Sequence, residues 1–169
     1  FLHGFYHKET GLEVLAESFG VADKLKRSLL TEGEGEFFGL KKGKIRDRLV
    51  EGKKIYQNLI GKDDIYGFVA PAWLFKPELI PVLAELGFVV TEDHQYIYEG
   101  KTNTRIKCPV MNWATRSFVR KYGSLMVCPM LSRMWAKEPL IRIAVHPSDF
   151  DHSDTIDNIR RVLDFEMEH

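Results

Sequence analysis

The sequence predicts an α/β fold, in which strands alternate with helices to form a parallel sheet or a barrel of βα units. Short apolar runs typical of buried strands are followed by segments in which apolar residues recur at helical spacing. The chain has 169 residues, of which 44% are hydrophobic and 28% are charged, as in an ordinary globular domain. No repeat, low-complexity tract or flexible linker interrupts residues 1–169, so we expect a single domain.

The first half of the chain contains the most regular elements. Its opening letters, "FLH", are typical of the end of a strand, and residues 44–60 have helical spacing that Gly61 can end as a C-cap. The run "YGFVAPAW" indicates a buried strand that ends at Pro71. Residues 76–86 predict the next helix, with Gly87 as its stop.

The second half is less regular between residues 91 and 139. Residues 88–90, just before this region, are a strand candidate, and the runs "YIYE" and "SLMVCPML" are strand candidates within it. Residues 140–145 predict a later strand. A closing amphipathic helix follows, and its expected inward residues are Ile156, Ile159 and Leu163.

Charge and cysteine content exclude some classes of protein. Basic and acidic residues number 24 each, so no net field favours nucleic acid or an anionic membrane surface, and no apolar run is long enough to span a bilayer. Cys108 and Cys128 form no C-x-x-C pair and suit a reduced compartment, which slightly favours the cytoplasm, although a disulfide between them stays open. Because the chain begins with Phe1, a signal peptide cannot be judged, and localisation and oligomeric state stay open.

Three stretches lie just past the ends of predicted strands, where parallel α/β folds collect their chemistry: residues 3–7, 71–73 and 146–149. If the chain turns into a helix after His3, then His3 and His7 lie on one face and can hold one metal ion. Imidazole suits zinc and its first-row neighbours, but a catalytic site also needs a third protein ligand and an open position for water. Two ordinary surface histidines are the alternative.

The other two stretches offer groups for acid–base chemistry and for substrate binding. His146 follows a buried strand, where an imidazole can give or take a proton. Asp149 can orient His146, or it can be a turn or capping residue. Pro71 can aim a backbone amide at an oxyanion, and Trp73 can stack on a sugar ring or pack in the core.

Weaker candidates are Glu36, Arg116 and the run Glu92, Asp93 and His94. The run can form a second metal site, but a polar loop at a strand edge is the favoured interpretation. Glu36 and Arg116 can reach the same pocket, with a solvated carboxylate and a surface guanidinium as the favoured alternatives.

In chain order, "LHGFYH", "FVAPAW" and "IAVHPSDF" resemble motifs of the polysaccharide deacetylase superfamily, the NodB-like amidohydrolases that include carbohydrate esterase family 4. The chain looks most similar to a divergent branch of uncharacterised bacterial deacetylase-like proteins, from residue 1 to about residue 150. The resemblance implies a distorted (β/α)7-type barrel, incomplete at its N-terminus. It also implies that His3 and His7 bind the metal, that Pro71, Ala72 and Trp73 bind the substrate, and that His146 and Asp149 are catalytic.

The chain departs from the family in two places. The family's arginine, two residues before the proline, is Val69 here. The family also has an early strand that ends in paired aspartates, one the general base and one the third metal ligand. We expect that strand to precede Phe1 in the natural protein.

The resemblance implies a metal-dependent hydrolase that removes N-acetyl groups from a sugar or polysaccharide. The cofactor would be a divalent metal, Zn²⁺ first, with Co²⁺ or Ni²⁺ as alternatives, and the partner an N-acetylated sugar or glycan. A backbone N–H near Ala72 or Trp73 would help to hold the oxyanion, and His146 would protonate the departing amine. One alternative, favoured slightly by Val69, is an inactive relative that binds metal or carbohydrate. Another is a βα module with incidental histidines.

Overall fold

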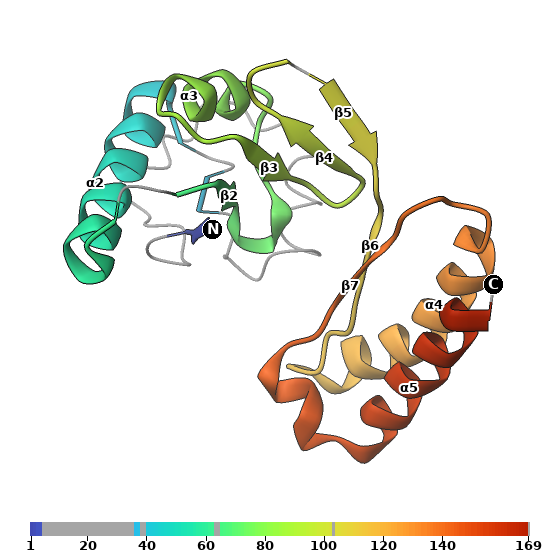
Figure 1. Ribbon diagram of the computed structural model, residues 1–169. Helices are drawn as coiled ribbons and strands as arrows, with labels where there is room; N and C mark the ends of the chain where they lie inside the picture. Colours follow the sequence, from blue (N-terminus) through green and yellow to red (C-terminus); the bar gives the residue numbers. More distant parts are fainter. Residues whose placement is uncertain (5–35, 38–39, 63–64, 103, 169) are drawn as a thin grey trace. The chain divides into compact units, whose positions relative to one another are not determined.

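The computed structural model describes residues 1–4, 36–37, 40–62, 65–102 and 104–168. These residues divide into two compact units, Phe1–Ile106 and Lys107–His169, and each unit is treated by itself below. Figure 1 labels the helices and strands of both units. His7 lies outside the described residues.

The first unit contains a five-stranded sheet with the order β1-β2-β3-β4-β5. Its strands are β1 (Leu2–His3), β2 (Gly67–Val69), β3 (Val90–Glu92), β4 (Tyr96–Glu99) and β5 (Thr104–Lys107). Strands β1, β2 and β3 are parallel, whereas β4 is antiparallel to β3. The sheet is therefore mixed, and its parallel part is formed by the strands that precede the predicted site.

The expected distorted (β/α)7-type barrel is wrong: the described residues form an open five-stranded sheet and a separate two-stranded sheet, with no closed barrel. The physical reason lies in the connection from β3 to β4. Only residues 93–95 separate these strands, whereas a parallel neighbour needs a crossover of a dozen or more residues. The chain must therefore turn back at this point, and the alternation of strands and helices stops.

Two helices cover one face of the parallel strands. α2 (Lys42–Ile60) ends at Gly61, which has a left-handed φ of 71° and donates its N–H to the Gln57 carbonyl at 2.8 Å. α3 (Leu79–Glu85) is followed by Gly87, whose φ is 85°. Buried residues of both helices form one core with the strands, and this core includes Ile45, Leu49, Phe68, Leu79, Val82, Leu83 and Phe88. The two predicted helices and their glycine stops are confirmed.

The second unit packs two helices on a two-stranded parallel sheet. The strands are β6 (Val110–Asn112) and β7 (Arg142–Ala144), and the helices are α4 (Phe118–Trp135) and α5 (Ser153–Glu168). A short 3-10 turn, η2 (Pro147–Asp151), joins β7 to α5. The core of this unit contains Met111, Trp113, Cys128, Ile159 and Val162.

Several predicted boundaries and faces need correction. The strand expected at residues 88–90 is β3, two residues later, and the strand expected at 140–145 is the shorter β7. The strand predicted for "YIYE" is confirmed as β4. In α5, Ile159 points inward as expected, but Val162 is buried in place of Leu163, which is 40% exposed.

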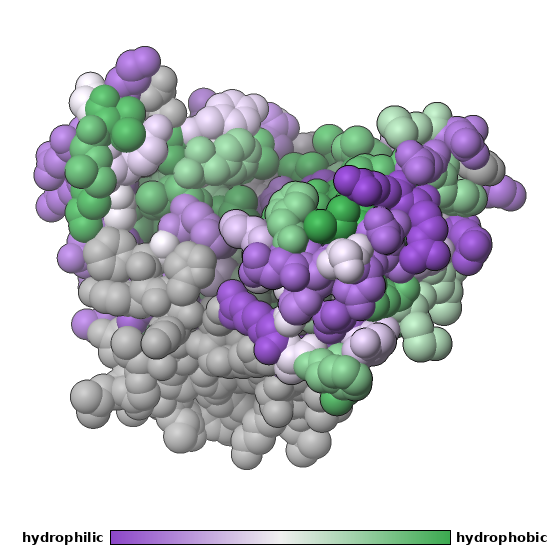
Figure 2. All heavy atoms as spheres, turned by 90° about the horizontal axis from the view of Figure 1, so that it is seen from below, coloured by the Kyte–Doolittle hydropathy of each residue, from purple (hydrophilic) through white to green (hydrophobic). Residues whose placement is uncertain are grey.

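The run "SLMVCPML" was expected to be a strand and lies inside helix α4. This helix has apolar residues on nearly all sides, so its sequence lacks the recurrence of apolar residues every three to four positions that identifies an amphipathic helix. Its exposed residues include Val119, Met126 and Met134. Figure 2 shows green apolar atoms lying among purple polar ones on one face of the described surface. Within the described ranges, no helix combines the length and apolar character needed to cross a bilayer.

A side-chain bridge compensates for Pro129 in the interior of α4. Proline has no N–H, so the carbonyl of Leu125, four residues earlier, loses its helical donor. Asn158 of α5 donates its side-chain N–H to that carbonyl at 2.9 Å. The other end of the same amide accepts a hydrogen bond from Trp113 Nε1 at 3.0 Å. One asparagine thus joins α4, α5 and the end of β6.

We predict that Asn158→Ala lowers the free energy of unfolding by about 2–4 kcal/mol, because it leaves two interior polar groups without their partner. In a Pro129→Ala background, the new N–H at position 129 can serve the Leu125 carbonyl. The same asparagine substitution should then cost about 1–3 kcal/mol less. Urea unfolding followed by tryptophan fluorescence measures both values, and an equal cost in the two backgrounds would contradict the bridge.

Candidate functional site

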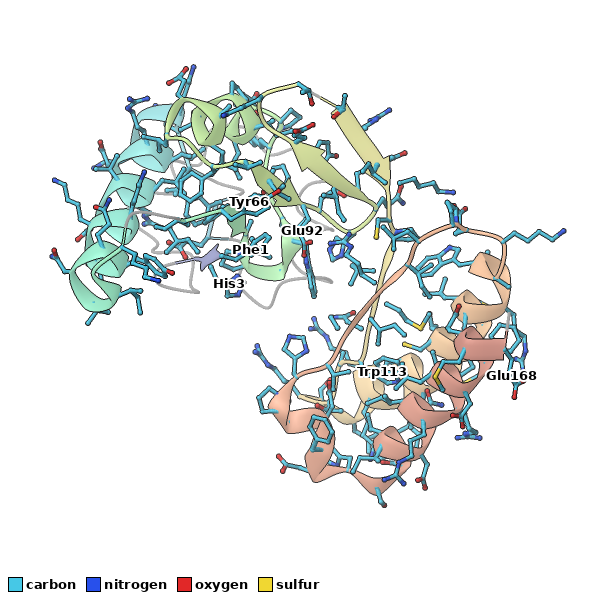
Figure 3. All side chains as sticks on the ribbon, viewed as in Figure 1. Phe1, His3, Tyr66, Glu92, Trp113 and Glu168 are labelled. Carbon is cyan, nitrogen blue, oxygen red and sulfur yellow. The ribbon has the colours of Figure 1, made fainter. Side chains whose placement is uncertain are left out.

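The register of the parallel strands places three residues in one row at the carboxyl end of the sheet. His3 of β1 is opposite Val69 of β2, and Val69 is opposite Glu92 of β3. Successive residues of a strand point to opposite faces, so this row lies on the face away from the α2–α3 core, into which Phe68 is buried. Figure 3 labels His3 and Glu92 in this part of the first unit.

His3 has the hydrogen bond that metal-binding histidines usually have. Its Nδ1 lies 2.8 Å from the Val69 carbonyl oxygen, which can only accept, so Nδ1 carries the proton. In the neutral ring the lone pair is then on Nε2. Ligating histidines commonly donate their second ring N–H to a backbone carbonyl in this way. The chemistry of His3 therefore fits a metal ligand, although no three His, Cys, Asp or Glu side chains of the described residues could together hold an ion.

The loop after β2 is a tight turn, η1 (Pro71–Trp73), with unusual backbone angles. Ala72 and Trp73 both have a φ of 53°, as in a type I′ turn, and the Leu74 N–H donates to the Pro71 carbonyl at 3.2 Å. Glycine and asparagine are the residues that suit such positions. The left-handed conformation costs other residues about 1–2 kcal/mol each, so strain is stored directly beside the His3 row.

The turn aims the Trp73 indole at the end of β3. Trp73 Nε1 donates to Glu92 Oε1 at 2.9 Å, and the indole and the His94 ring have centroids 5.6 Å apart. Trp73 is half-buried, so it belongs neither to the core nor to the open surface. The sequence predicted that Glu92 and His94 form a second metal site or a polar loop at a strand edge. The structure places both next to Trp73, a predicted substrate-binding residue.

Asp93, between these two residues, is a turn residue. Its Oδ1 accepts the backbone N–H groups of Gln95 and Tyr96, both at 2.7 Å. Its Oδ2 accepts the Tyr98 hydroxyl at 2.5 Å. Burial and this hydrogen bond together raise the pKa of Tyr98 well above its usual range. Asp93 therefore orders the β3–β4 connection.

Glu36 is a buried residue of this region, so the expectation of a solvated carboxylate was wrong. Its side chain is 0% exposed, and Arg48 Nη1 of α2 lies 3.0 Å from Glu36 Oε1. The carboxylate also borders Gly4, where an added Cβ would lie 2.8 Å from Glu36 Oε2 and 2.2 Å from Pro71 Cγ. Gly4 therefore lets the chain pass between Pro71 and the ion pair directly after His3. No local signal in the sequence distinguishes Glu36 from a surface glutamate.

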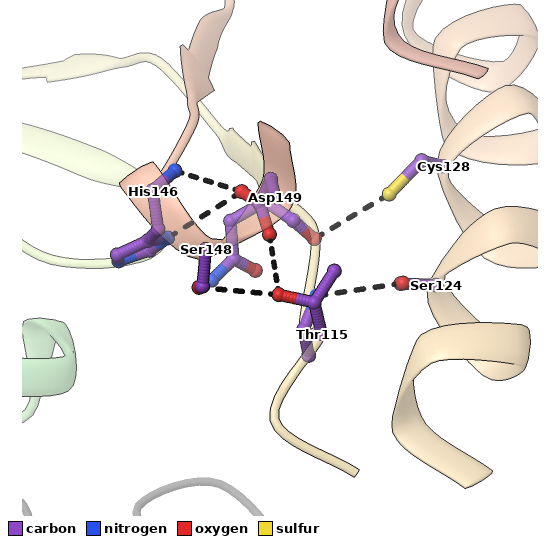
Figure 4. A network of polar contacts seen from close by, with 8 residues as sticks. Thr115, Ser124, Cys128, His146, Ser148 and Asp149 are labelled. Atoms are coloured by element: carbon purple, nitrogen blue, oxygen red, sulfur yellow. Dashed lines mark hydrogen bonds and ion pairs between the residues drawn. The ribbon is translucent and has the colours of Figure 1, made fainter. Parts of the chain in front are cut away.

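In the second unit, a buried carboxylate holds the loop that carries His146, as Figure 4 shows. Asp149 is 0% exposed, and its Oδ2 accepts the His146 backbone N–H at 2.7 Å. Its Oδ1 accepts the Thr115 hydroxyl at 2.9 Å, and the Thr115 oxygen also lies 3.2 Å from the Ser148 hydroxyl oxygen. The imidazole of His146 is about half exposed, and its Nδ1 lies 3.9 Å from Asp149 Oδ2, beyond hydrogen-bond distance. The capping role left open for Asp149 is confirmed, and its catalytic role stays a prediction.

The two cysteines are free thiols, and both are buried in the second unit. Cys128 Sγ donates to the Asn112 carbonyl at 3.4 Å. Burial, and then the negative charge of Asp149, raises the pKa of the Cys128 thiol to about 12. Arg116, the last weak candidate, is exposed, as its surface interpretation expected.

The structure thus places Gly4, the residue after His3, against Pro71, which begins the turn that carries Ala72 and Trp73, and it joins Trp73 to Glu92 and His94. Glu92 could have been found from the sequence, because it also ends a strand. His146 and Asp149 belong to the second unit, and their meeting with His3 stays a prediction.

We predict that Gly4→Ala lowers the free energy of unfolding by about 1–3 kcal/mol, because the new methyl group would overlap the Pro71 ring. Gly43→Ala is the matched control: nothing lies within 4 Å of that Cβ in α2, so this change should stabilise by about 0.5–1 kcal/mol. Chemical denaturation of both variants measures the difference. A Gly4→Ala variant with an unchanged free energy of unfolding would contradict the close approach of Gly4 to Pro71.

We predict that Ala72→Gly raises the free energy of unfolding by about 0.5–1 kcal/mol, because glycine adopts a positive φ without strain. By contrast, we expect Ala84→Gly in helix α3 to lower the free energy of unfolding by about 1 kcal/mol. Thermal unfolding of the two variants should give melting temperatures that move in opposite directions. If both fall, Ala72 does not have the left-handed conformation.

Comparison with known proteins found no matching family model, no matching curated protein and no matching solved structure. The resemblance to polysaccharide deacetylases therefore stays a prediction, and the geometry of the two units is what supports a function.

Proposed function

We propose that this chain belongs to a metal-dependent hydrolase that removes N-acetyl groups from a sugar or polysaccharide. The observation that carries the proposal is the hydrogen bond from His3 Nδ1 to the Val69 carbonyl, at the carboxyl end of β1 and beside the Pro71–Trp73 turn. It gives the first histidine of the H-x-x-x-H motif the tautomer that a metal ligand needs, next to the turn expected to bind substrate.

His3 and His7 would hold a divalent ion, with Zn²⁺ as the first choice and Co²⁺ or Ni²⁺ as alternatives. When bound, such an ion polarises an acetamido carbonyl and acidifies a water molecule. The Val69 carbonyl orients the His3 ring, and Gly4 leaves space for the chain between Pro71 and Glu36. These contacts would fix the first ligand before the metal arrives.

The strained turn would supply an amide for the oxyanion. Trp73 N–H already donates to the Ala70 carbonyl at 2.9 Å, so we assign the oxyanion role to the Ala72 N–H. His146 would protonate the departing amine, because an amine leaves readily only when it is neutral. Asp149 would hold the backbone of His146 through its 2.7 Å hydrogen bond.

A second candidate is an inactive relative that binds metal or carbohydrate. The observation that favours it is Val69, which puts an apolar side chain between His3 and Glu92, where the resembled family has an arginine two residues before the proline. No charge at this position can orient a general base.

The test is acetate release from N-acetylglucosamine oligosaccharides by the intact natural protein with added Zn²⁺ or Co²⁺. We expect His3→Ala to lose at least about 100-fold in acetate release together with metal binding, since it removes a ligand. His146→Ala should lose acetate release but keep the metal. His152→Ala, which removes a histidine from the loop before α5, is the control and should change neither.

Three outcomes separate the candidates. Equal acetate release from the wild type and His3→Ala would overturn the hydrolase. Metal binding by elemental analysis without any acetate release would favour the inactive relative. A protein that takes up no divalent metal would favour incidental histidines.

A further inference from the structure

The side of helix α4 that faces away from the core is apolar along its length. Every fourth residue on this side is large and apolar, with an exposed fraction between 46% and 78%, and these residues are here called the outer ridge: Phe118, Tyr122, Met126, Met130 and Met134. Val119 and Val127 lie beside the ridge and are also exposed. The buried residues of α4, Cys128 and Ser132, lie on the opposite side of the helix. Surface helices usually present polar residues to solvent, so the outer ridge indicates a contact surface.

The area of this surface matches one side of a stable interface. The exposed fractions of the outer ridge, Val119 and Val127 amount to roughly 800 Å², taking about 150–250 Å² for a large side chain that is fully exposed. A standard interface buries about 800 Å² on each partner. Single exposed apolar side chains are common and need no partner, whereas a continuous apolar surface of this size marks an interaction site.

The spacing of the exposed residues lets a second helix lie along α4. Val119, Gly123, Met126 and Met130 recur at intervals of four, three and four positions, which is the spacing of a seam between helices that cross at about 20°. Gly123 leaves a recess in this seam, because nothing lies within 4 Å of an added Cβ. A flexible methionine of a facing helix can fill such a recess. One helix thus has both the protruding residues and the recess that accepts them, as a self-complementary surface requires.

The charges beside the seam favour a second copy of this chain in the antiparallel orientation. α4 has no acidic residue, and Arg133 lies near its C-terminal end. Asp154 and Asp157 of α5, which packs beside α4 (Figure 1), border the N-terminal half through a groove that Tyr122 and Met126 also line. Their side chains are 42% and 67% exposed. Antiparallel helices centred on Met126 place each Arg133 near the acidic end of the other copy, whereas parallel helices would place it against its own copy.

We propose that the outer ridge of α4 is the interface of a homodimer, in which two copies pair antiparallel about a two-fold axis at Met126. Phe118 then faces Met134 of the second copy, and Tyr122 faces Met130, so aromatic rings meet thioethers along the seam. The rings of Phe118 and Tyr122 already lie together, with centroids 4.4 Å apart. This interface goes beyond the proposed function and does not depend on it.

Sedimentation equilibrium of the intact protein tests the dimer, and we expect the wild type to have the mass of two chains at micromolar concentration. Met126→Glu places two like charges against each other on the axis, so it should raise the dissociation constant at least about tenfold. Met126→Leu keeps an apolar side chain and should stay dimeric. Met167→Glu in α5 is the matched control, because Met167 is 77% exposed and Met126 is 78% exposed, and it should also stay dimeric.

Cysteine cross-linking under a mild oxidant tests the orientation, and the two native thiols are buried. Met126→Cys should form a disulfide between two chains, because position 126 meets its own copy on the axis. Met134→Cys alone should form none, since its two copies are about 24 Å apart along the seam. A mixture of Phe118→Cys and Met134→Cys chains should form the mixed disulfide.

Several results would overturn the proposal, with circular dichroism used to select variants that remain folded. A wild-type dimer that Met126→Glu leaves intact, or that Met167→Glu disrupts equally, would place the interface elsewhere. A cross-link through Met134→Cys alone would reject the antiparallel pairing. A monomeric wild type would reject the dimer, and binding of that monomer to vesicles of anionic phospholipid would assign the outer ridge to a membrane surface instead.

Discussion

The parallel pairing of β1 with β2 and of β2 with β3 is the constraint on which the candidate site depends. It aligns His3, Val69 and Glu92 in one row, although 66 positions separate His3 from the carbonyl that orients its ring. Because parallel strands end at the same edge, their following loops are also brought together. The Pro71–Trp73 turn, the Asp93 turn and the passage of Gly4 beside Pro71 all lie at this edge of the sheet.

The region around the row is built from groups that are costly to bury or to hold. Glu36 and Arg48 form a buried ion pair, and such pairs often add little net stability because both charges lose water. Ala72 and Trp73 add backbone strain at the same edge of the sheet. These costs are concentrated next to His3, whose ring has the tautomer of a metal ligand. A functional site explains this concentration better than a contribution to folding stability does.

In the second unit, two buried polar side chains each form hydrogen bonds with two other groups. Asp149 accepts the backbone N–H of His146, directly before the η2 turn, and the Thr115 hydroxyl. Asn158 bonds both the Leu125 carbonyl freed by Pro129 and the Trp113 indole. Buried polar groups are stable only when they are paired, so these two residues determine how the loop after β7 and the two helices pack. His146 is left half exposed on a loop whose backbone is fixed, which suits a residue that transfers protons.

The sequence by itself determined the elements whose signals are local. Helices α2 and α3 follow from their periodicity and glycine stops, and residues 3–7, 71–73 and 146–149 were recognised because each follows an apolar strand. Helix α4 was missed because it is apolar on nearly all sides, and the barrel was wrong because three residues between β3 and β4 force an antiparallel return. Only the tertiary structure decided that Glu36 is buried against Arg48 and that Glu92 binds the Trp73 indole. Those contacts join residues 12 and 19 positions apart through the packing of a helix and a sheet edge, and no local preference of either partner encodes them.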